Sequence, residues 1–323
     1  MAEGYLIEVE SRVWNGMATD KMSTDNRSSL VERVAEKLDL AEQGFTLPRL
    51  PTDNLDFDRS HSADSASPQE GSAHCKTAKI ARIDPVKAKR LGMTLPESAR
   101  HRTLEEFRII KRSMLANYHA LQEAGEKNAN VILVTSATPD DGKTFTALNL
   151  ARSFALDRDL DVLLIDTDLR RSNISELFGL EAERGLIAAL NDHSIRAQDL
   201  LVATDLDRLS IIPAGDSELK DIDLLASKRM KQIVAEVAWR RKDRIVIFDA
   251  PPVLATSDSS VLAAYAGQIA FVMAANKTSK AAAMEAIGLL QACPHIGIIL
   301  NKVGSQFGAF SFGKYYDSYA GNP

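Results

Sequence analysis

The feature that most constrains this sequence is a strand-like segment that runs directly into a glycine–lysine loop and then into a helix-like segment. Residues 131–135 are apolar up to a threonine, and residues 137–144 read alanine, four variable positions, Gly-Lys and threonine. A loop of this kind before a helix surrounds phosphate groups with backbone N–H donors, and the helix dipole adds partial positive charge. We therefore predict a phosphate-binding loop, in which Lys143 reaches the β- and γ-phosphates of a nucleotide and Thr144 offers its hydroxyl to Mg²⁺.

The remainder of the C-terminal two thirds alternates between strand-like and helix-like segments. Strands are predicted at 131–135, 162–166, 209–212, 244–248, 268–273 and 296–300, and helices at 103–124, 143–157, 227–242, 257–265 and 279–291. Near-continuous apolar strands separated by helices are typical of a mostly parallel sheet with helices on both faces, an α/β fold. Thr103 with Glu106 three residues later forms a capping-box pattern, which places the start of the first helix.

Three aspartates stand at the ends of two predicted strands. Asp166 and Asp168 close the strand 162–166, and Asp249 follows the strand 244–248 before two prolines that stiffen the chain. In an open α/β sheet, ligands bind at the carboxyl ends of the strands, and Mg²⁺ needs hard oxygen ligands there. The sequence therefore predicts a site for magnesium and a nucleotide at this edge of the sheet.

The segments on either side of the predicted nucleotide-binding domain, residues 101–303, have a different character. The N-terminal segment 1–38 contains a short amphipathic helix at 28–38, which either packs on this protein or docks on a partner. Residues 39–100 contain five of the 11 prolines and a long polar stretch, so we predict a largely disordered linker. Residues 304–323 form a predicted flexible tail that holds three of the six tyrosines.

Composition excludes several classes of function. The formal charge of −5 gives no bulk basic surface for nucleic acid. Two cysteines, Cys75 and Cys293, make no disulfide framework, and the six histidines lack the spacing of a zinc site. No apolar run approaches the ~18 residues that span a bilayer, and the N-terminus lacks a secretory signal. We expect a cytoplasmic protein whose contact with a membrane comes through a partner.

Three segments together resemble the bacterial tyrosine kinases of polysaccharide synthesis and export. They are the loop 137–144, the run Leu-Leu-Ile-Asp-Thr-Asp-Leu-Arg at 163–170, and Ile-Phe-Asp-Ala-Pro-Pro at 247–252. The resemblance covers about residues 103–319, and the residues at 105–112 and 29–38 are similar to the exosortase-associated autokinase subgroup. It implies a P-loop NTPase fold of the MinD/ParA kind and transfer of phosphate from ATP to protein tyrosine.

The resemblance also implies a set of site residues. Lys143, Asp166 and Asp168 would carry the catalysis, and Thr144, Asp166, Asp168 and Asp249 would hold Mg²⁺. The residues expected to contact ATP are Ala137, Thr138, Pro139, Asp140, Asp141, Gly142, Lys143, Thr144, Phe145, Arg170 and Asn301. For Asn301, which would read the adenine edge, a simple strand-end cap is the alternative.

Two further groups of residues gain a meaning from the family. Tyr315, Tyr316 and Tyr319 would be autophosphorylated, usually on a neighbouring subunit. Glu105, Arg108 and Lys111 correspond to a family motif in the subunit interface of a ring, and on residues alone they would form a solvated, salt-bridged helix face. Lys111 stands where the family has arginine, so it keeps the charge but lacks the bidentate fork.

The family implies partners as well. They are a membrane-anchored activator of the chain-length or co-polymerase type, which would recruit the kinase to the inner face of the membrane, and a tyrosine phosphatase. One alternative is a nucleotide-switch ATPase of the partition or division-site kind, although Thr138 stands where those proteins usually carry lysine. Another is an ATP-binding scaffold without catalysis.

The loop departs from the family at two acidic positions. Asp140 stands where glycine is common and would tolerate a positive φ angle at some cost. Two carboxylates beside a triphosphate repel it, unless they point to solvent or bind Mg²⁺. We therefore predict ATP binding that is weaker, or more dependent on Mg²⁺, than a glycine-containing loop would give.

Overall fold

The computed structural model describes residues 4–7, 80–90, 97–215, 222–239, 241 and 243–303. The predicted amphipathic helix at 28–38, most of the predicted linker and the tyrosine-bearing tail lie outside these residues. Among the described residues, none of the helices combines the length and the apolar character that crossing a membrane requires.

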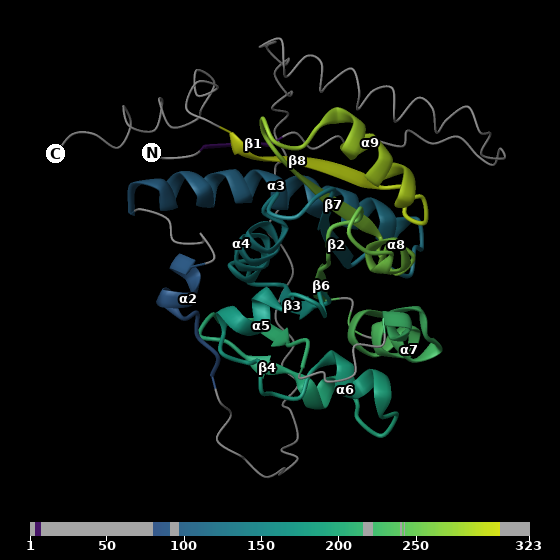
Figure 1. The fold of residues 1–323 in the computed structure, drawn as a ribbon. Helices are drawn as coiled ribbons and strands as arrows, with labels where there is room; N and C mark the ends of the chain where they lie inside the picture. Colours follow the sequence, from purple (N-terminus) through teal and green to yellow (C-terminus); the bar gives the residue numbers. More distant parts are fainter. Residues whose placement is uncertain are drawn as a thin grey trace, which may run out of the picture.

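An eight-stranded sheet forms the centre of the molecule (Figure 1). Its order is β1-β8-β7-β2-β6-β3-β5-β4, and the inner strands from β8 to β5 are all parallel. The strands are β1 Gly4–Ile7, β2 Val131–Ser136, β3 Asp161–Asp166, β4 Val202–Ala203, β5 Leu209–Ile212, β6 Arg244–Asp249, β7 Gln268–Ala274 and β8 Ile296–Val303. The mostly parallel α/β architecture and the six predicted strands are confirmed.

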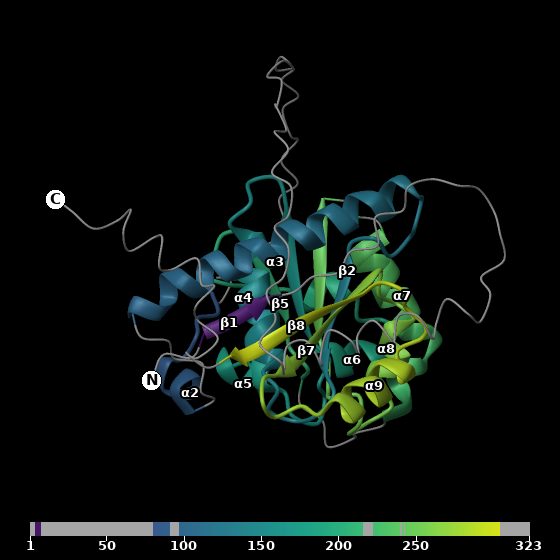
Figure 2. The same cartoon turned by 90° about the horizontal axis from the view of Figure 1, so that it is seen from above.

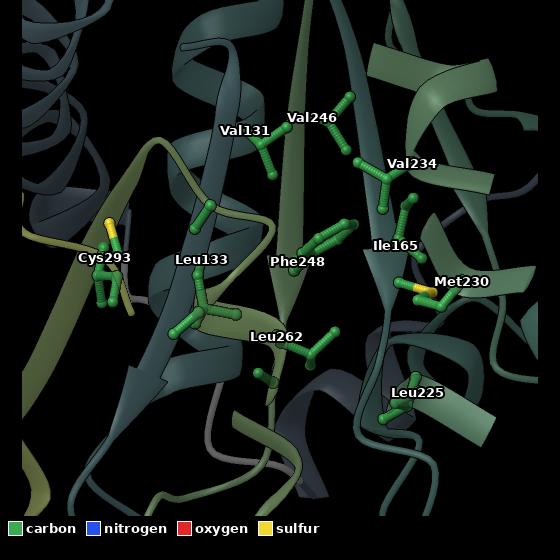
Figure 3. Packing of buried hydrophobic residues seen from close by; sticks show 14 of the residues in the cluster. Val131, Leu133, Ile165, Leu225, Met230, Val234, Val246, Phe248, Leu262 and Cys293 are labelled. Carbon is green, nitrogen blue, oxygen red and sulfur yellow. The ribbon is translucent and has the colours of Figure 1, made fainter. Parts of the chain in front are cut away.

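Helices cover both faces of this sheet, as predicted. Alternate side chains of the buried strands point to opposite faces, which gives two hydrophobic cores. One core packs against α3 Glu97–Glu123, α4 Lys143–Ala155 and α5 Asn173–Leu177. The other packs against α6 Leu186–Asn191, α7 Lys228–Val234, α8 Asp258–Ala263 and α9 Lys280–Leu289. Figure 2 shows α3 and α4 on one side of the strands and α8 and α9 on the other, and Figure 3 shows Phe248 of β6 inside the second core.

The first long helix starts earlier than the capping-box pattern predicts. Helix α3 begins at Glu97, so Thr103 lies inside it and is buried, and the predicted cap at Thr103 is wrong. A proline at position 96 and an acidic residue at 97 are the alternative start signals. One face of the helix packs on the sheet, because Phe107, Ile110, Met114, Tyr118 and Leu121 are buried at helical spacing.

Part of the predicted linker is folded against the domain. Residues 80–90, here called the strap, contain helix α2 Pro85–Arg90. Ala81 donates its N–H to the carbonyl of Ala203 at 2.8 Å and pairs with Thr204 beside β4. The Lys87 ammonium lies 2.5 Å from Glu181, and Arg90 pairs with Glu176 of α5. The disorder predicted for 39–100 therefore does not hold for the strap or for the start of α3.

The predicted helix 227–242 is shorter and changes type. Ser227 caps α7 by accepting the Met230 N–H, and the chain then forms a π-helix, η3, over Ala235–Trp239. The Asn130 side chain donates to the carbonyl of Ala238 within η3 and to that of Arg244 at the start of β6. These two hydrogen bonds hold the chain between η3 and β6. The 3-10 helices η1 Ala197–Leu200 and η2 Ile222–Ala226 complete the described elements.

Candidate nucleotide site

The phosphate-binding loop connects the central strand β2 to the 13-residue helix α4. Gly142 has a φ of 100°, and a Cβ at this position would lie 1.9 Å from Nδ2 of Asn301. Only glycine therefore fits between the loop and β8. Asp140 has a φ of 64°, so it adopts the left-handed conformation that an aspartate can tolerate here at some cost.

Lys143 begins α4 and lies among carboxylates at the edge of the sheet. Its ammonium is 2.8 Å from Oδ2 of Asp168 and 3.9 Å from Oδ1 of Asp249. Burial by itself lowers the pKa of Lys143, but the charges of Asp249 and Asp168 outweigh it, and the net pKa is raised. Lys143 is therefore fully charged at the N-terminus of α4.

Asp166 and Asp249 lie side by side in register on β3 and β6, and both are fully buried. Burial, together with the charge of Asp249, raises the pKa of Asp166 to about 8. Burial likewise raises the pKa of Asp249 to about 6, against the opposing effect of Lys143. Such raised values at the carboxyl edge of a parallel sheet are typical of a functional site.

The donor set fits Mg²⁺ bound together with a nucleotide. Within the part of the chain that the structure describes, no hydrogen bond reaches the buried Oδ1 of Asp166, and the buried carboxylate of Asp249 has only the Thr144 hydroxyl and the more distant Lys143 ammonium beside it. The described residues contain no group of three or more His, Cys, Asp or Glu side chains arranged to hold a metal by themselves. Mg²⁺ is usually held by one or two protein carboxylates plus water and substrate phosphates, and the buried carboxylates of Asp166 and Asp249 are two such groups.

Asn301 holds the phosphate-binding loop from β8. Its Nδ2 donates to the Asp141 carbonyl at 2.9 Å, and its Oδ1 accepts the Lys302 N–H at 2.8 Å. Both polar groups of the amide are thus used within the protein. Asn301 lies within β8 and not at its end, so a strand-end cap does not describe it, and the adenine-reading role stays a prediction.

The other predicted site residues lie in different surroundings. Phe145 faces the core, with its ring 6.1 Å from that of Phe107. Arg170 is exposed beyond β3. On α3, Arg108 pairs with Glu105 of the same helix, and the Lys111 ammonium lies 3.3 Å from Asp157 at the end of α4. Tyr315, Tyr316 and Tyr319 lie outside the described residues.

Sequence reasoning missed three residues that shape the site. Ser175 of α5 donates from its backbone N–H and its hydroxyl to Oδ2 of Asp166, at 2.9 and 2.8 Å. Thr278 donates to Asp141, and Lys277 donates to the Pro139 carbonyl. Position after β7 was a usable signal for Thr278, because parallel strands end at one edge of the sheet. No comparable signal marks Ser175.

The loop after a central parallel strand, with aspartates ending two neighbouring strands, defines a P-loop nucleotide-binding protein. Residues 132–313, more than half of the chain, match the family described as "CobQ/CobB/MinD/ParA nucleotide binding domain". The chain is therefore a P-loop nucleotide-binding protein of this family.

Within this class the relatives are tyrosine kinases, and the chain belongs to the bacterial tyrosine-protein kinases. It is 32% identical over 228 residues to tyrosine-protein kinase YwqD of Bacillus subtilis (strain 168), spanning 70% of this chain and 90% of that protein. The solved kinase domain of the Escherichia coli tyrosine kinase ETK is 30% identical, with a TM-score of 0.52, and the match covers 61% of this chain and 76% of that one. The solved kinase domain of VpsO is 31% identical, with a TM-score of 0.50, and the match covers 61% of this chain and 96% of that one.

The chain matches only part of several other relatives. It spans 24% of tyrosine-protein kinase etk of Escherichia coli (strain K12), at 34% identity over 180 residues and 55% of this chain. The activities of those longer proteins are therefore only proposed for this chain.

Proposed function

We propose that this protein is an ATP-dependent tyrosine autokinase that phosphorylates Tyr315, Tyr316 and Tyr319 of its C-terminal tail. The observation that carries the proposal is the charged Lys143 beside the buried carboxylates of Asp168 and Asp249, next to the buried Asp166, in a chain of the tyrosine-kinase family. Tyrosines that follow β8 within about 20 residues have the reach to enter the site of a neighbouring subunit.

The chain's own residues divide the work of phosphoryl transfer. When bound, Mg·ATP supplies the γ-phosphoryl group and neutralises charge on its oxygens. Lys143, the first residue of the helix after the loop, would exchange its ion pair with Asp168 for the phosphate oxygens of the nucleotide. Asp249 and Thr144 would hold the metal or its water. Asp166, whose Oδ2 is fixed by Ser175, would take the tyrosyl proton on Oδ1 when its carboxyl is ionised.

The decisive experiment is mass-spectrometric mapping of phosphate after incubation of the full chain with Mg·ATP. We expect phosphate on the three tail tyrosines, and none in the Lys143→Met variant. A matched variant with phenylalanine at all three tail positions should bind nucleotide normally and accept no phosphate there. Phosphotyrosine that persists in Lys143→Met, or a wild-type tail that stays unmodified with its activator present, would overturn the proposal.

The wider setting is also proposed from the family resemblance. The kinase would act in exopolysaccharide synthesis and export, recruited to the membrane by a chain-length or co-polymerase-type activator and reset by a phosphatase. Ring assembly would bring Glu105, Arg108 and Lys111 to a subunit interface. The Glu105–Arg108 pair is half exposed, which leaves it accessible to a second subunit. Light scattering with and without Mg·ATP tests for this assembly.

A nucleotide-switch ATPase is the second candidate, because the matched family description includes MinD and ParA. It predicts ATP hydrolysis, nucleotide-dependent dimers and no phosphotyrosine. The same mass-spectrometric mapping, combined with phosphate release in solution, separates it from the kinase. A scaffold without catalysis would keep partner binding in an Asp166→Asn, Asp249→Asn double variant.

A further inference from the structure

The side chain of Asp141 is turned into the phosphate-binding loop and is fully buried. Its Oδ2 accepts the Thr138 backbone N–H at 2.9 Å, and the Thr138 hydroxyl lies 3.1 Å from both of its oxygens. The neighbouring Asp140 is exposed instead. The two adjacent aspartates of the loop therefore have different surroundings: Asp140 is exposed and Asp141 is buried.

A second element ties this carboxylate to the sheet. The Thr278 hydroxyl, in the turn after β7, donates to Oδ1 of Asp141 at 2.9 Å. The same hydroxyl accepts the backbone N–H of Ala274, the last residue of β7, at 2.9 Å. A continuous hydrogen-bonded path thus runs from a buried strand through Thr278 and Asp141 to the first half of the loop.

Backbone geometry shows why such a brace is useful. Asp141 stands between two residues with left-handed φ angles, 64° at Asp140 and 100° at Gly142. Left-handed conformations at non-glycine residues are unfavourable unless surrounding contacts hold them. The loop must keep this shape for its N–H groups to converge on a phosphate. Contacts that fix it before binding reduce the ordering cost of binding.

We propose that Asp141 is a positioning residue, which with Thr278 as its partner holds the phosphate-binding loop in its nucleotide-binding shape. It acts through the loop backbone and not by contact with the nucleotide. The inference rests on the proposed function only in that the loop binds a nucleotide. It reverses the sequence-based expectation for this residue, because a carboxylate satisfied inside the loop supports binding and does not repel the triphosphate.

Repulsion by Asp141 and bracing by Asp141 predict opposite changes in nucleotide affinity for the Asp141→Asn variant. If the charge repelled the nucleotide, its removal would tighten binding. If Asp141 braces the loop, the amide replaces an acceptor with a donor that faces the Thr138 N–H, and binding weakens. We expect the dissociation constant of a fluorescent mant-ATP analogue with Mg²⁺ to rise about tenfold or more. An unchanged or tighter dissociation constant overturns the proposal.

Thr278 provides an uncharged test of the same brace. Thr278→Val removes the hydroxyl at nearly constant volume and should raise the dissociation constant about tenfold, because a hydrogen bond to a carboxylate is lost. Thr278→Ser keeps the hydroxyl and should restore wild-type binding. The matched control is Thr204→Val, which removes a buried, hydrogen-bonded hydroxyl beside β4 and should leave binding unchanged.

Thermal melting of each variant separates the brace from general stability. A merely structural role lowers the melting temperature and leaves the dissociation constant of the folded fraction unchanged, and that result would overturn the inference. Equal binding by Thr278→Val and wild type would do the same. Wild-type protein that binds no nucleotide would instead remove the proposed function, so the two failures are distinguishable.

Discussion

At the scale of single residues, the phosphate-binding loop shows how neighbouring acids acquire different roles. Asp140 is exposed with a left-handed backbone, and Lys302 binds its carbonyl at 2.8 Å. Asp141 is buried and fully hydrogen bonded. The sequence indicated that Asp140 could tolerate a positive φ angle, but it did not indicate that the side chain of Asp141 turns inward, because its partner Thr278 is 137 residues away.

Substitution of Asp140 should separate its charge from its backbone strain. Asp140→Gly removes both, so we expect the dissociation constant for mant-ATP to fall by about two- to threefold. Asp140→Asn removes the charge and keeps a side chain that tolerates positive φ, so its smaller gain should fade at high salt. Titration at low and high ionic strength measures both effects. A wild-type dissociation constant in both variants would contradict this account of Asp140.

At the scale of elements, sequence patterns located the strands well and the short helices poorly. Strands such as β2 are buried along their whole length, so their apolar runs stand out. Helix α5 has five residues and α6 has six, which is too short for a helical repeat to appear in the sequence. The strand β1 pairs with β8 across some 290 residues of chain, a contact that local patterns cannot reveal.

Helix α3 offers a matched test of its packing on the sheet. Ile110 is 1% exposed and Ile109 is 37% exposed, one residue apart on the same helix. Ile110→Ala should lower the free energy of unfolding by about 2–4 kcal/mol, because it opens a cavity in the core. Ile109→Ala should change it by about 0.5 kcal/mol or less. Urea denaturation measures both, and similar losses in the two variants would mean that α3 does not pack as described.

At the scale of the whole molecule, the site is assembled by strand order. The loop follows β2, and the aspartates end β6 and β3, its neighbours on one side, while Thr278 and Asn301 come from β7 and β8 on the other. The sequence predicted the first half of this arrangement because motif and strand end coincide there. In the second half it predicted Asn301 as a site residue, although with a role toward adenine and not toward the loop, and it missed Thr278, since a single polar residue after β7 belongs to no motif.

The strap should contribute measurably to the stability of the whole chain. Ala81→Pro removes the N–H that binds the Ala203 carbonyl, so we expect a loss of about 1–3 kcal/mol in the free energy of unfolding. Ala81→Gly keeps the N–H and should lose only about 1 kcal/mol or less. Urea denaturation of the full chain compares them. Equal stability of the proline variant and wild type would show that the strap docks too weakly to matter.

The strap and β1 together cover both margins of the sheet, one beside β4 and the other along β8. A bare strand at a sheet margin offers unpaired N–H and C=O groups to any other chain. Segments that precede the nucleotide-binding domain therefore pair with backbone groups at both margins of its sheet, with β1 as the new outermost strand beside β8. A version of the protein trimmed to its motif-bearing part would leave the backbone groups of β8 that now bind β1 open to pairing with a second chain.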